Sequence, residues 1–114
     1  MPLKVMYLDD EIELCNNFVE LFESDRVHIV AFTNPTEAMA AAKASPPDLM
    51  FIDYRLPSVS GDQVAQALDP KIPKILVTGD ISVVTSYRFV EVLSKPYREA
   101  EILKIFDRFG QSAA

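Results

Sequence analysis

The sequence predicts an α/β domain built on a single doubly wound five-stranded parallel sheet, with helices on both of its faces. Two observations predict this fold. Five short runs rich in apolar and β-branched residues recur along the 114 residues, and the segments between them have helical or loop character. That alternation favours one parallel sheet covered on both sides. The runs read as buried strands at Leu3–Leu8, Val27–Phe32, Leu49–Ile52, Lys74–Thr78 and Val90–Leu93.

The first two helices are expected between the first three strands. Segment 10–24 carries a helical stripe of apolar residues that should face the core, namely Leu14, Phe18, Leu21 and Phe22. Segment 34–45 begins with Asn34 as a cap and Pro35 at the first helical position. Pro46 ends that helix, because proline cannot continue a helical hydrogen-bond ladder.

The later helices are less regular in pattern. Segment 60–68 fits a short helix, and segment 97–109 places four apolar residues on one face: Ile102, Ile105, Phe106 and Phe109. The crossover at 79–89 is short and composed of mediocre helix formers. It has room for about two helical turns, so we expect a shortened or irregular fourth helix there.

Composition and charge exclude several classes of protein. The length suits one domain spanning 1–114, and the single Cys15 cannot form an internal disulfide, which favours a reducing compartment. No segment resembles a signal peptide or nears the roughly 20 apolar residues of a membrane span. A net charge of -6, with scattered basic residues, argues against direct nucleic-acid binding. We therefore expect a soluble cytoplasmic protein with no membrane contact.

Polar residues follow the expected strands at the points where the strands end. Asp9 and Asp10 follow the first strand, Asp53 the third, Thr78 closes the fourth and Lys95 follows the fifth. Because the carboxyl ends of parallel strands meet at one edge of a sheet, where such sheets bind ligands, these side chains should gather there. An apolar strand then has a reason to end on a carboxylate: it carries Asp53 through the core to the site edge.

Carboxylates gathered in this way repel one another. One pair at about 4 Å costs roughly 4 kcal/mol at an effective dielectric near 20, so cations must compensate. Lys95 offers one charge, and Mg²⁺, which prefers oxygen ligands, offers two more. Carboxylate, metal, hydroxyl and ammonium together suit phosphoryl transfer. The chain has no Gly-rich phosphate loop, so the phosphoryl group must come from another molecule.

The motifs resemble those of the receiver domain of bacterial two-component response regulators over nearly the whole chain. They are Asp9-Asp10-Glu11 after the first strand, Asp53-Tyr54-Arg55-Leu56-Pro57 with Gly61, Thr78-Gly79, and Lys95-Pro96-Tyr97. Each is weak alone, and their order at successive strand ends makes the set specific. The resemblance implies a flavodoxin-like sheet of order 2-1-3-4-5.

By that resemblance, Asp53 accepts a phosphoryl group from a phosphohistidine. Asp10, Asp53 and the backbone carbonyl of Arg55 would hold Mg²⁺, with Asp9 acting mainly through water. The implied partners are a sensor histidine kinase or phosphotransfer protein and a downstream protein or output domain, with a phosphorylation-dependent dimer as a further option. Such a domain catalyses its own phosphoryl transfer and slow dephosphorylation and is otherwise a signalling module, not an enzyme.

The resemblance also assigns the phosphoryl contacts. Thr78, with Gly79 beside it, would reorient to hydrogen-bond one phosphoryl oxygen, and Lys95 would pair with another. The family commonly has a cis Lys-Pro bond that aims the lysine. Arg55 and Asp80 each lie two positions past a site residue. There they either set the lifetime of the phosphorylated state or are simply solvated charges.

One position departs from the family pattern. Val92 stands three residues before Lys95, where the family usually has a Tyr or Phe that moves with the threonine. We therefore expect phosphorylation to reorder segment 79–89 itself, and partner or dimer contacts to depend on that segment.

Other interpretations remain open at this stage. A small Mg²⁺-dependent aspartate-based phosphohydrolase uses similar residues. Such enzymes, however, carry a D-x-D-x-T pattern at the first strand, and the residues from Asp9 onward lack it. A receiver-like interaction module that no longer uses phosphate is a third interpretation. The complete set of phosphoryl-transfer residues argues against it, namely Asp10, Asp53, Thr78 and Lys95. The acids after the first strand also suit a helix start, which is the preferred interpretation for Glu11. His28 and Cys15 are expected to be structural.

Overall fold

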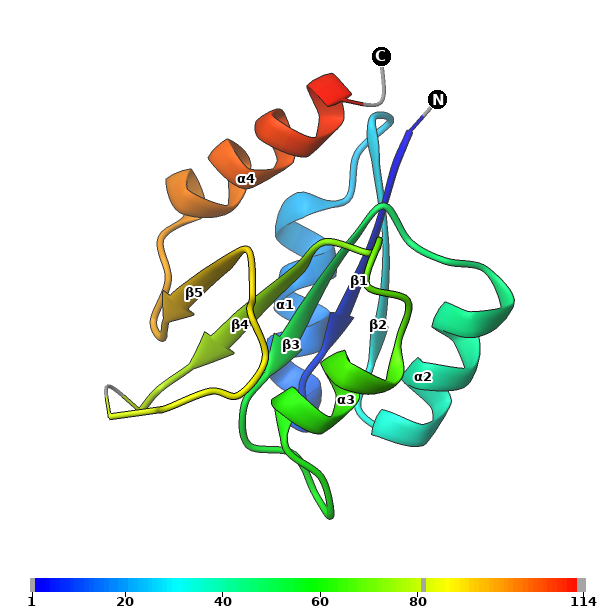
Figure 1. Ribbon diagram of the computed structural model, residues 1–114. Helices are drawn as coiled ribbons and strands as arrows, with labels where there is room; N and C mark the ends of the chain where they lie inside the picture. Colours follow the sequence, from blue (N-terminus) through cyan, green and yellow to red (C-terminus); the bar gives the residue numbers. More distant parts are fainter. Residues whose placement is uncertain (1, 81, 113–114) are drawn as a thin grey trace.

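The computed structural model, which describes residues 2–80 and 82–112, contains a five-stranded sheet with helices on both faces (Figure 1). All strand pairs are parallel, in the order β2-β1-β3-β4-β5. The predicted fold class and strand order are confirmed. The elements are β1 (Leu3–Leu8), α1 (Ile12–Phe22), β2 (Val27–Phe32), α2 (Pro35–Ala44), β3 (Leu49–Asp53), α3 (Gly61–Ala67), β4 (Lys74–Thr78), β5 (Glu91–Ser94) and α4 (Glu99–Ser112).

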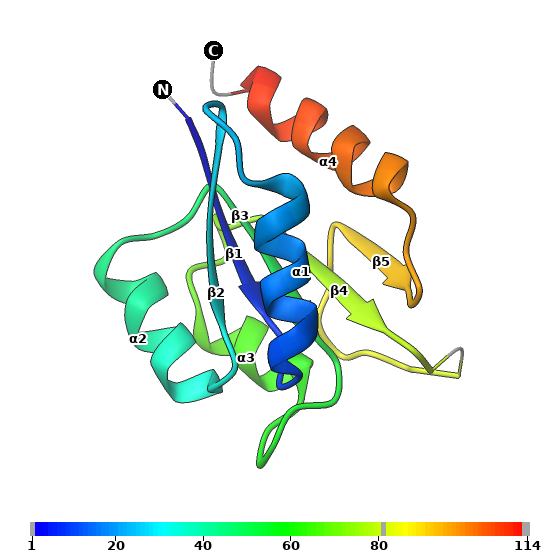
Figure 2. The same cartoon turned by 180° about the vertical axis from the view of Figure 1, so that it is seen from behind.

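The helices form one layer on each face of the sheet. Helices α1 and α4 cover one face, and α2 and α3 cover the other, as Figures 1 and 2 show from opposite sides. Every residue of β3 and β4 is buried. The two edge strands are not: β2 and β5 have alternating or largely exposed residues. The prediction of five buried strands is therefore wrong for the edges, where one neighbouring strand and part of the helical cover are missing.

Helix α1 packs on the sheet through Cys15, Phe18 and Phe22, which are all buried. Leu21, predicted to face the core, is 59% exposed, because the buried stripe of the helix passes through the next residue, Phe22, instead. Burial, with the charge of Asp9 adding to it, raises the pKa of the Cys15 thiol to about 11. A buried thiol that stays protonated agrees with the structural role expected of Cys15.

Helix starts follow the local sequence signals. The Asn34 side chain accepts a hydrogen bond from the Glu37 N–H at the start of α2, as predicted. Ser60 and Gln63 form a reciprocal capping box at the start of α3. Such caps satisfy backbone donors that a helix start leaves without partners, so both helices begin at defined residues.

The crossover from β4 to β5 has no helix among its described residues, 79–80 and 82–90, which confirms the expected irregularity. Side-chain contacts hold it on the α3 side of the sheet instead. The N–H and hydroxyl of Ser86 both donate to the Asp62 carboxylate of α3. Lys74 donates to the Tyr87 hydroxyl at 2.9 Å. Tyr87 and Phe89 pack against the apolar cluster beneath α2 and α3.

Candidate functional site

A cleft of about 610 Å³ opens at the carboxyl ends of β1, β3, β4 and β5. Its lining residues come from four separate parts of the chain, namely Asp10, Glu11, Asp53, Arg55, Thr78, Gly79, Asp80 and Lys95. The parallel topology therefore brings together most of the residues singled out from the sequence. Asp9 lies behind this lining and is fully buried.

Lys95 connects the two buried carboxylates of the site. Its ammonium lies 2.9 Å from Asp9 Oδ2 and 2.9 Å from Asp53 Oδ1. Burial by itself would lower the pKa of Lys95, but its hydrogen bonds to Asp53 and Asp9 outweigh that effect and raise the pKa. Lys95 is thus a fixed positive charge between two carboxylates, and it offsets part of their mutual repulsion, as expected from the sequence. The Lys95–Pro96 bond is cis, as the resemblance implied.

Asp53 is the last residue of β3 and is 6% exposed. Burial raises the pKa of its carboxyl to about 6, with Lys95 opposing the rise and the charge of Asp9 adding to it. The following loop returns close to this residue. A Cβ on Gly61 would lie 2.8 Å from the Asp53 carbonyl oxygen, so the motif needs glycine at that position.

The acidic cluster fits a hard divalent cation. One carboxylate oxygen each from Asp9, Asp10 and Asp53 lies within 4.8 Å of the others. Asp10 is exposed and faces the cleft, whereas one oxygen of Asp9 already binds Lys95. Oxygen-only ligands with room for water are the set that Mg²⁺ prefers. The donor chemistry therefore suits Mg²⁺ at the Asp10 and Asp53 side of the cluster.

Thr78 closes the opposite side of the cleft. Its Oγ1 accepts the Asp80 N–H at 3.0 Å and lies 3.5 Å from the Asp80 carbonyl oxygen, to which it donates. The hydroxyl is therefore engaged with the crossover backbone rather than with Asp53.

Arg55 and Asp80 form an ion pair across the mouth of the cleft. Their closest nitrogen and oxygen are 2.7 Å apart. Two hydrogen bonds from Ser82, together with the Arg55 guanidinium, lower the pKa of Asp80 to about 2. The pair joins the β3–α3 loop to the start of the crossover. Sequence reasoning singled out both residues but not their contact, because 25 positions separate them and no local pattern links them.

Two tyrosines adjoin the site. Tyr97 was noted in the sequence only as part of the Lys95-Pro96-Tyr97 motif, without a role, and Tyr7 was not singled out. The Tyr7 hydroxyl lies 3.0 Å from the Tyr97 hydroxyl and 3.5 Å from Asp9 Oδ2. Burial, the Tyr97 contact and the nearby Asp9 charge raise the pKa of Tyr7 far above its ordinary range, so it stays protonated. A signal was available, because Tyr7 lies near the end of β1, two residues before Asp9, and extended backbone points alternate residues to the same side.

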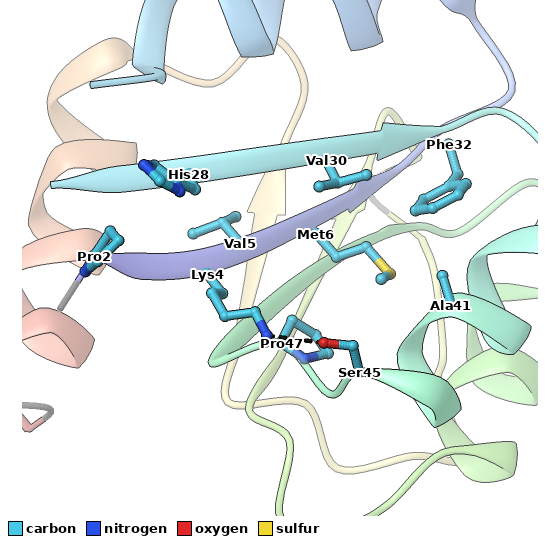
Figure 3. A pocket seen from close by; sticks show the side chains of 10 residues that line it. All are labelled: Pro2, Lys4, Val5, Met6, His28, Val30, Phe32, Ala41, Ser45 and Pro47. Carbon is cyan, nitrogen blue, oxygen red and sulfur yellow. Dashed lines mark hydrogen bonds between the residues drawn. The ribbon is translucent and has the colours of Figure 1, made fainter. Parts of the chain in front are cut away.

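A second hollow, of about 370 Å³, lies on the outer half of the sheet (Figure 3). The alanine-rich helix α2 contributes only the small side chain of Ala41 to its lining. His28 and Val30 line it from the edge strand, and both are exposed rather than packed. No carboxylate lines this hollow, so among the described residues it offers none of the phosphoryl-transfer chemistry of the cleft.

Val92 lies on the edge strand β5 and is 52% exposed. Tyr87 and Phe89, the nearest aromatic residues of the crossover, pack edge to face with each other at 5.0 Å between ring centroids. Both pack against the apolar cluster beneath α2 and α3. No described helix is both long enough and apolar enough to cross a bilayer.

Comparison with known proteins agrees with this geometry. A family model described as response regulator receiver domain matches residues 5–107. Nodulation protein W of Bradyrhizobium diazoefficiens is 30% identical over 108 residues, which are 87% of this chain and 47% of that protein. The polar-differentiation response regulator DivK of Brucella anthropi is 34% identical over 83 residues, covering 68% of each chain.

Solved structures agree in fold. A CheY-like response regulator receiver domain protein from Methanospirillum hungatei superimposes with a TM-score of 0.87 at 20% identity, with both chains fully covered. Receiver domains are signalling domains that generally bind Mg²⁺ and generally act between a kinase and a downstream partner. The chain belongs to the response regulator receiver domain family of two-component signalling systems.

Proposed function

We propose that this receiver domain accepts a phosphoryl group on Asp53 from a phosphohistidine of a sensor histidine kinase or phosphotransfer protein. The observation that carries the proposal is the position of Asp53. It ends a fully buried strand, reaches an open cleft, contacts Lys95 at 2.9 Å and lies beside Asp9 and Asp10. A carboxylate that is nucleophilic, oriented and next to a cation site suits attack on phosphorus.

The transfer forms one bond and breaks one. An Asp53 carboxylate oxygen attacks phosphorus, the bond between phosphorus and the histidine nitrogen breaks, and the nitrogen keeps the electron pair. The imidazole then takes a proton from solvent. Lys95 stays at the cleft and offers its ammonium to the phosphoryl oxygens, whose charge spreads during transfer.

Asp10, Asp53 and the Arg55 carbonyl are the proposed Mg²⁺ ligands, with Asp9 acting through water. The ion, when bound, neutralises the acidic cluster and the phosphoryl oxygens. Thr78 completes the site when its hydroxyl leaves Asp80 and donates to a phosphoryl oxygen, with Gly79 beside it. The Asp80 backbone then loses its hydrogen bonds to Thr78, so the start of the crossover can rearrange.

Signal output is proposed to pass through segment 79–89. Its start is held by Thr78 and by the Arg55–Asp80 pair, both of which border Asp53 in the cleft. A downstream protein, an output domain or a second phosphorylated copy would contact this segment in the cytoplasm. Slow hydrolysis of the acyl phosphate would end the signal.

Incubation with acetyl phosphate tests the assignment. Wild-type protein should take up acid-labile phosphate only with Mg²⁺ present, and Asp53→Asn, which keeps the shape of the side chain, should take up none. Asp25→Asn is the matched control and should label fully, because Asp25 is exposed and does not line the cleft. Full labelling of Asp53→Asn would falsify the assignment. Sustained hydrolysis of a generic phosphate ester would indicate a phosphohydrolase instead.

A further inference from the structure

Tyr7 places a hydroxyl group inside the apolar core, where packing alone does not require one. The residue is 1% exposed, and its ring stacks on Phe18 with 4.1 Å between ring centroids. Phenylalanine would fill the same volume. A buried phenol hydroxyl needs a hydrogen-bond partner, and the partners available to Tyr7 are Tyr97 and Asp9. The hydroxyl therefore connects the core to the acidic cluster.

The direction of these hydrogen bonds follows from the carboxylate. An ionised carboxylate only accepts, so Tyr7 donates its single proton to Asp9 Oδ2. The Tyr7 oxygen is then left to accept from the Tyr97 hydroxyl at 3.0 Å. Asp9 Oδ2 also accepts from Lys95 at 2.9 Å. Four groups are thus joined in sequence: Tyr97 donates to Tyr7, and Tyr7 and Lys95 donate to one oxygen of Asp9.

The two ends of this hydrogen-bonded network are Lys95 and Tyr97, which are also close in sequence, with only Pro96 between them. Lys95 also contacts Asp53, the proposed phosphoryl acceptor. Tyr97 lies two residues before α4 (Glu99–Ser112) and packs edge to face on Phe18 at 6.3 Å between centroids. A change at Lys95 can therefore reach Tyr97 by two routes, along the backbone through Pro96 and through the Asp9 carboxylate and the Tyr7 hydroxyl.

We propose that Tyr7 is a positioning residue that holds Asp9 and, with Tyr97, forms a hydroxyl relay from the phosphorylation cleft to the start of α4. The proposal rests on the phosphoryl acceptance proposed above. A phosphoryl group on Asp53 draws the Lys95 ammonium toward its oxygens and away from Asp9. Asp9 is fully buried and cannot lose a donor without cost.

The Tyr7 hydroxyl can move closer to Asp9 than it lies in this structure. The contact between Tyr7 and Asp9 is 3.5 Å, long for a hydroxyl–carboxylate hydrogen bond, so it can shorten when Lys95 withdraws. A shift of the Tyr7 hydroxyl toward Asp9 lengthens its contact with Tyr97 or pulls Tyr97 along. Either result changes how Tyr97, which leads into α4, is held: it loses a hydrogen-bond partner or it moves with Tyr7. Val92 offers no aromatic ring for a movement of this kind, and the relay is a separate path from the cleft.

Amide NMR spectra with and without Mg²⁺ and beryllofluoride test the relay. In wild-type protein, beryllofluoride should shift the signals of Thr78 and Gly79 and also those of residues 97–102. In Tyr7→Phe and in Tyr97→Phe the shifts at 78–79 should remain, while those at 97–102 should be clearly reduced, because only the backbone route from Lys95 is left. Tyr87→Phe is the matched control, because it removes another half-buried tyrosine hydroxyl that lies in the crossover. It should keep the 97–102 response.

The outcomes separate the relay from the function on which it rests. Wild-type spectra that do not change at 78–79 overturn phosphoryl acceptance and the relay together. Normal changes at 78–79 with none at 97–102 in the wild type, or an undiminished 97–102 response in Tyr7→Phe, overturn the relay alone. If Tyr7→Phe fails to fold, Tyr97→Phe decides, because Tyr97 is only half-buried and its ring packing is kept.

Discussion

The two sides of Asp53 are built in opposite ways. On the Lys95 side, an ammonium contacts two buried carboxylates, and the buried Tyr7 supports one of them from the core. On the Thr78 side, the hydroxyl contacts a crossover that has no helix among its described residues. The first side is held by buried charges, which are costly to separate. The second is held by a few polar contacts at the surface.

Movement should cost less free energy on the Thr78 side than on the Lys95 side. A hydrogen bond between neutral groups contributes only about 0.5–1.5 kcal/mol, whereas separating a buried ion pair costs about 3–5 kcal/mol. Segments with few buried apolar contacts open at low free energy. A phosphoryl group that redirects the Thr78 hydroxyl should therefore change the crossover more readily than the β5 side.

The largest expected effect comes from removing the charge of Lys95. Lys95→Met leaves Asp9 buried without its cation beside two further carboxylates, so unfolding free energy without metal should fall by about 3 kcal/mol. Urea unfolding measures the loss, and Mg²⁺ should restore part of it. Lys71→Met is the control, because Lys71 is exposed and lies before the amino end of β4, away from the cleft at the carboxyl ends of the strands. An unchanged free energy for Lys95→Met would show that Asp9 and Asp53 do not depend on it.

A smaller loss is expected on the crossover side. Asp62→Ala removes the acceptor for both Ser86 donors and should lower the unfolding free energy by about 1–3 kcal/mol. Amide exchange should quicken at 82–90 while the β3 amides keep their protection. If exchange quickens equally in β3, the crossover is not an independently held segment, and the contrast between the two sides is wrong.

Metal should act through the acidic cluster between the two sides. At Mg²⁺ concentrations about ten times its Kd, wild-type protein should gain about 1.4 kcal/mol. Asp10→Ala should lose that gain and be at least as stable as wild type without metal, because one repelling charge is gone. Thermal melts with and without millimolar Mg²⁺ measure both. Wild-type melting that ignores Mg²⁺, with early melting of Asp10→Ala, would make the acidic pair structural.

The smallest effect on stability is expected at the mouth of the cleft. Arg55 is 76% exposed, so Arg55→Ala should leave the melting temperature unchanged within error. Its effect should appear in the acyl phosphate, which should hydrolyse faster once the ion pair no longer restricts water at the mouth. Loss of radiolabelled phosphate with time measures this, with Arg26→Ala as the control. An equal lifetime in both variants would leave Arg55 as a solvated charge.

Much of the fold could be predicted because it depends on local patterns. Apolar runs, the Asn34 cap and the Pro35 start are read within a few residues, and parallel topology then places strand ends together. The position of Asp53 beside Asp10 and Lys95 followed from that topology. Leu21 was misplaced because the helical stripe alone does not fix which of two adjacent residues meets the sheet.

Contacts that depend on side-chain placement in three dimensions could not be predicted. Arg55 meets Asp80 only because two loops end at the same edge, and Ser86 meets Asp62 only because the crossover turns back over α3. The exposure of β2 and β5 depends on strand order, which the runs themselves do not reveal. The tyrosine pair was open to prediction in part, since strand periodicity places Tyr7 beside Asp9.

Amide exchange of the crossover tests whether phosphorylation at Asp53 acts on segment 79–89. Exchange would be measured at 82–89 in wild-type protein with Mg²⁺ alone and with Mg²⁺ plus beryllofluoride. We predict that protection in this segment changes when the mimic binds, more than it changes in β3 or in Glu91–Ser94. Equal protection of 82–89 in both states, with changes elsewhere in the chain, would contradict the account.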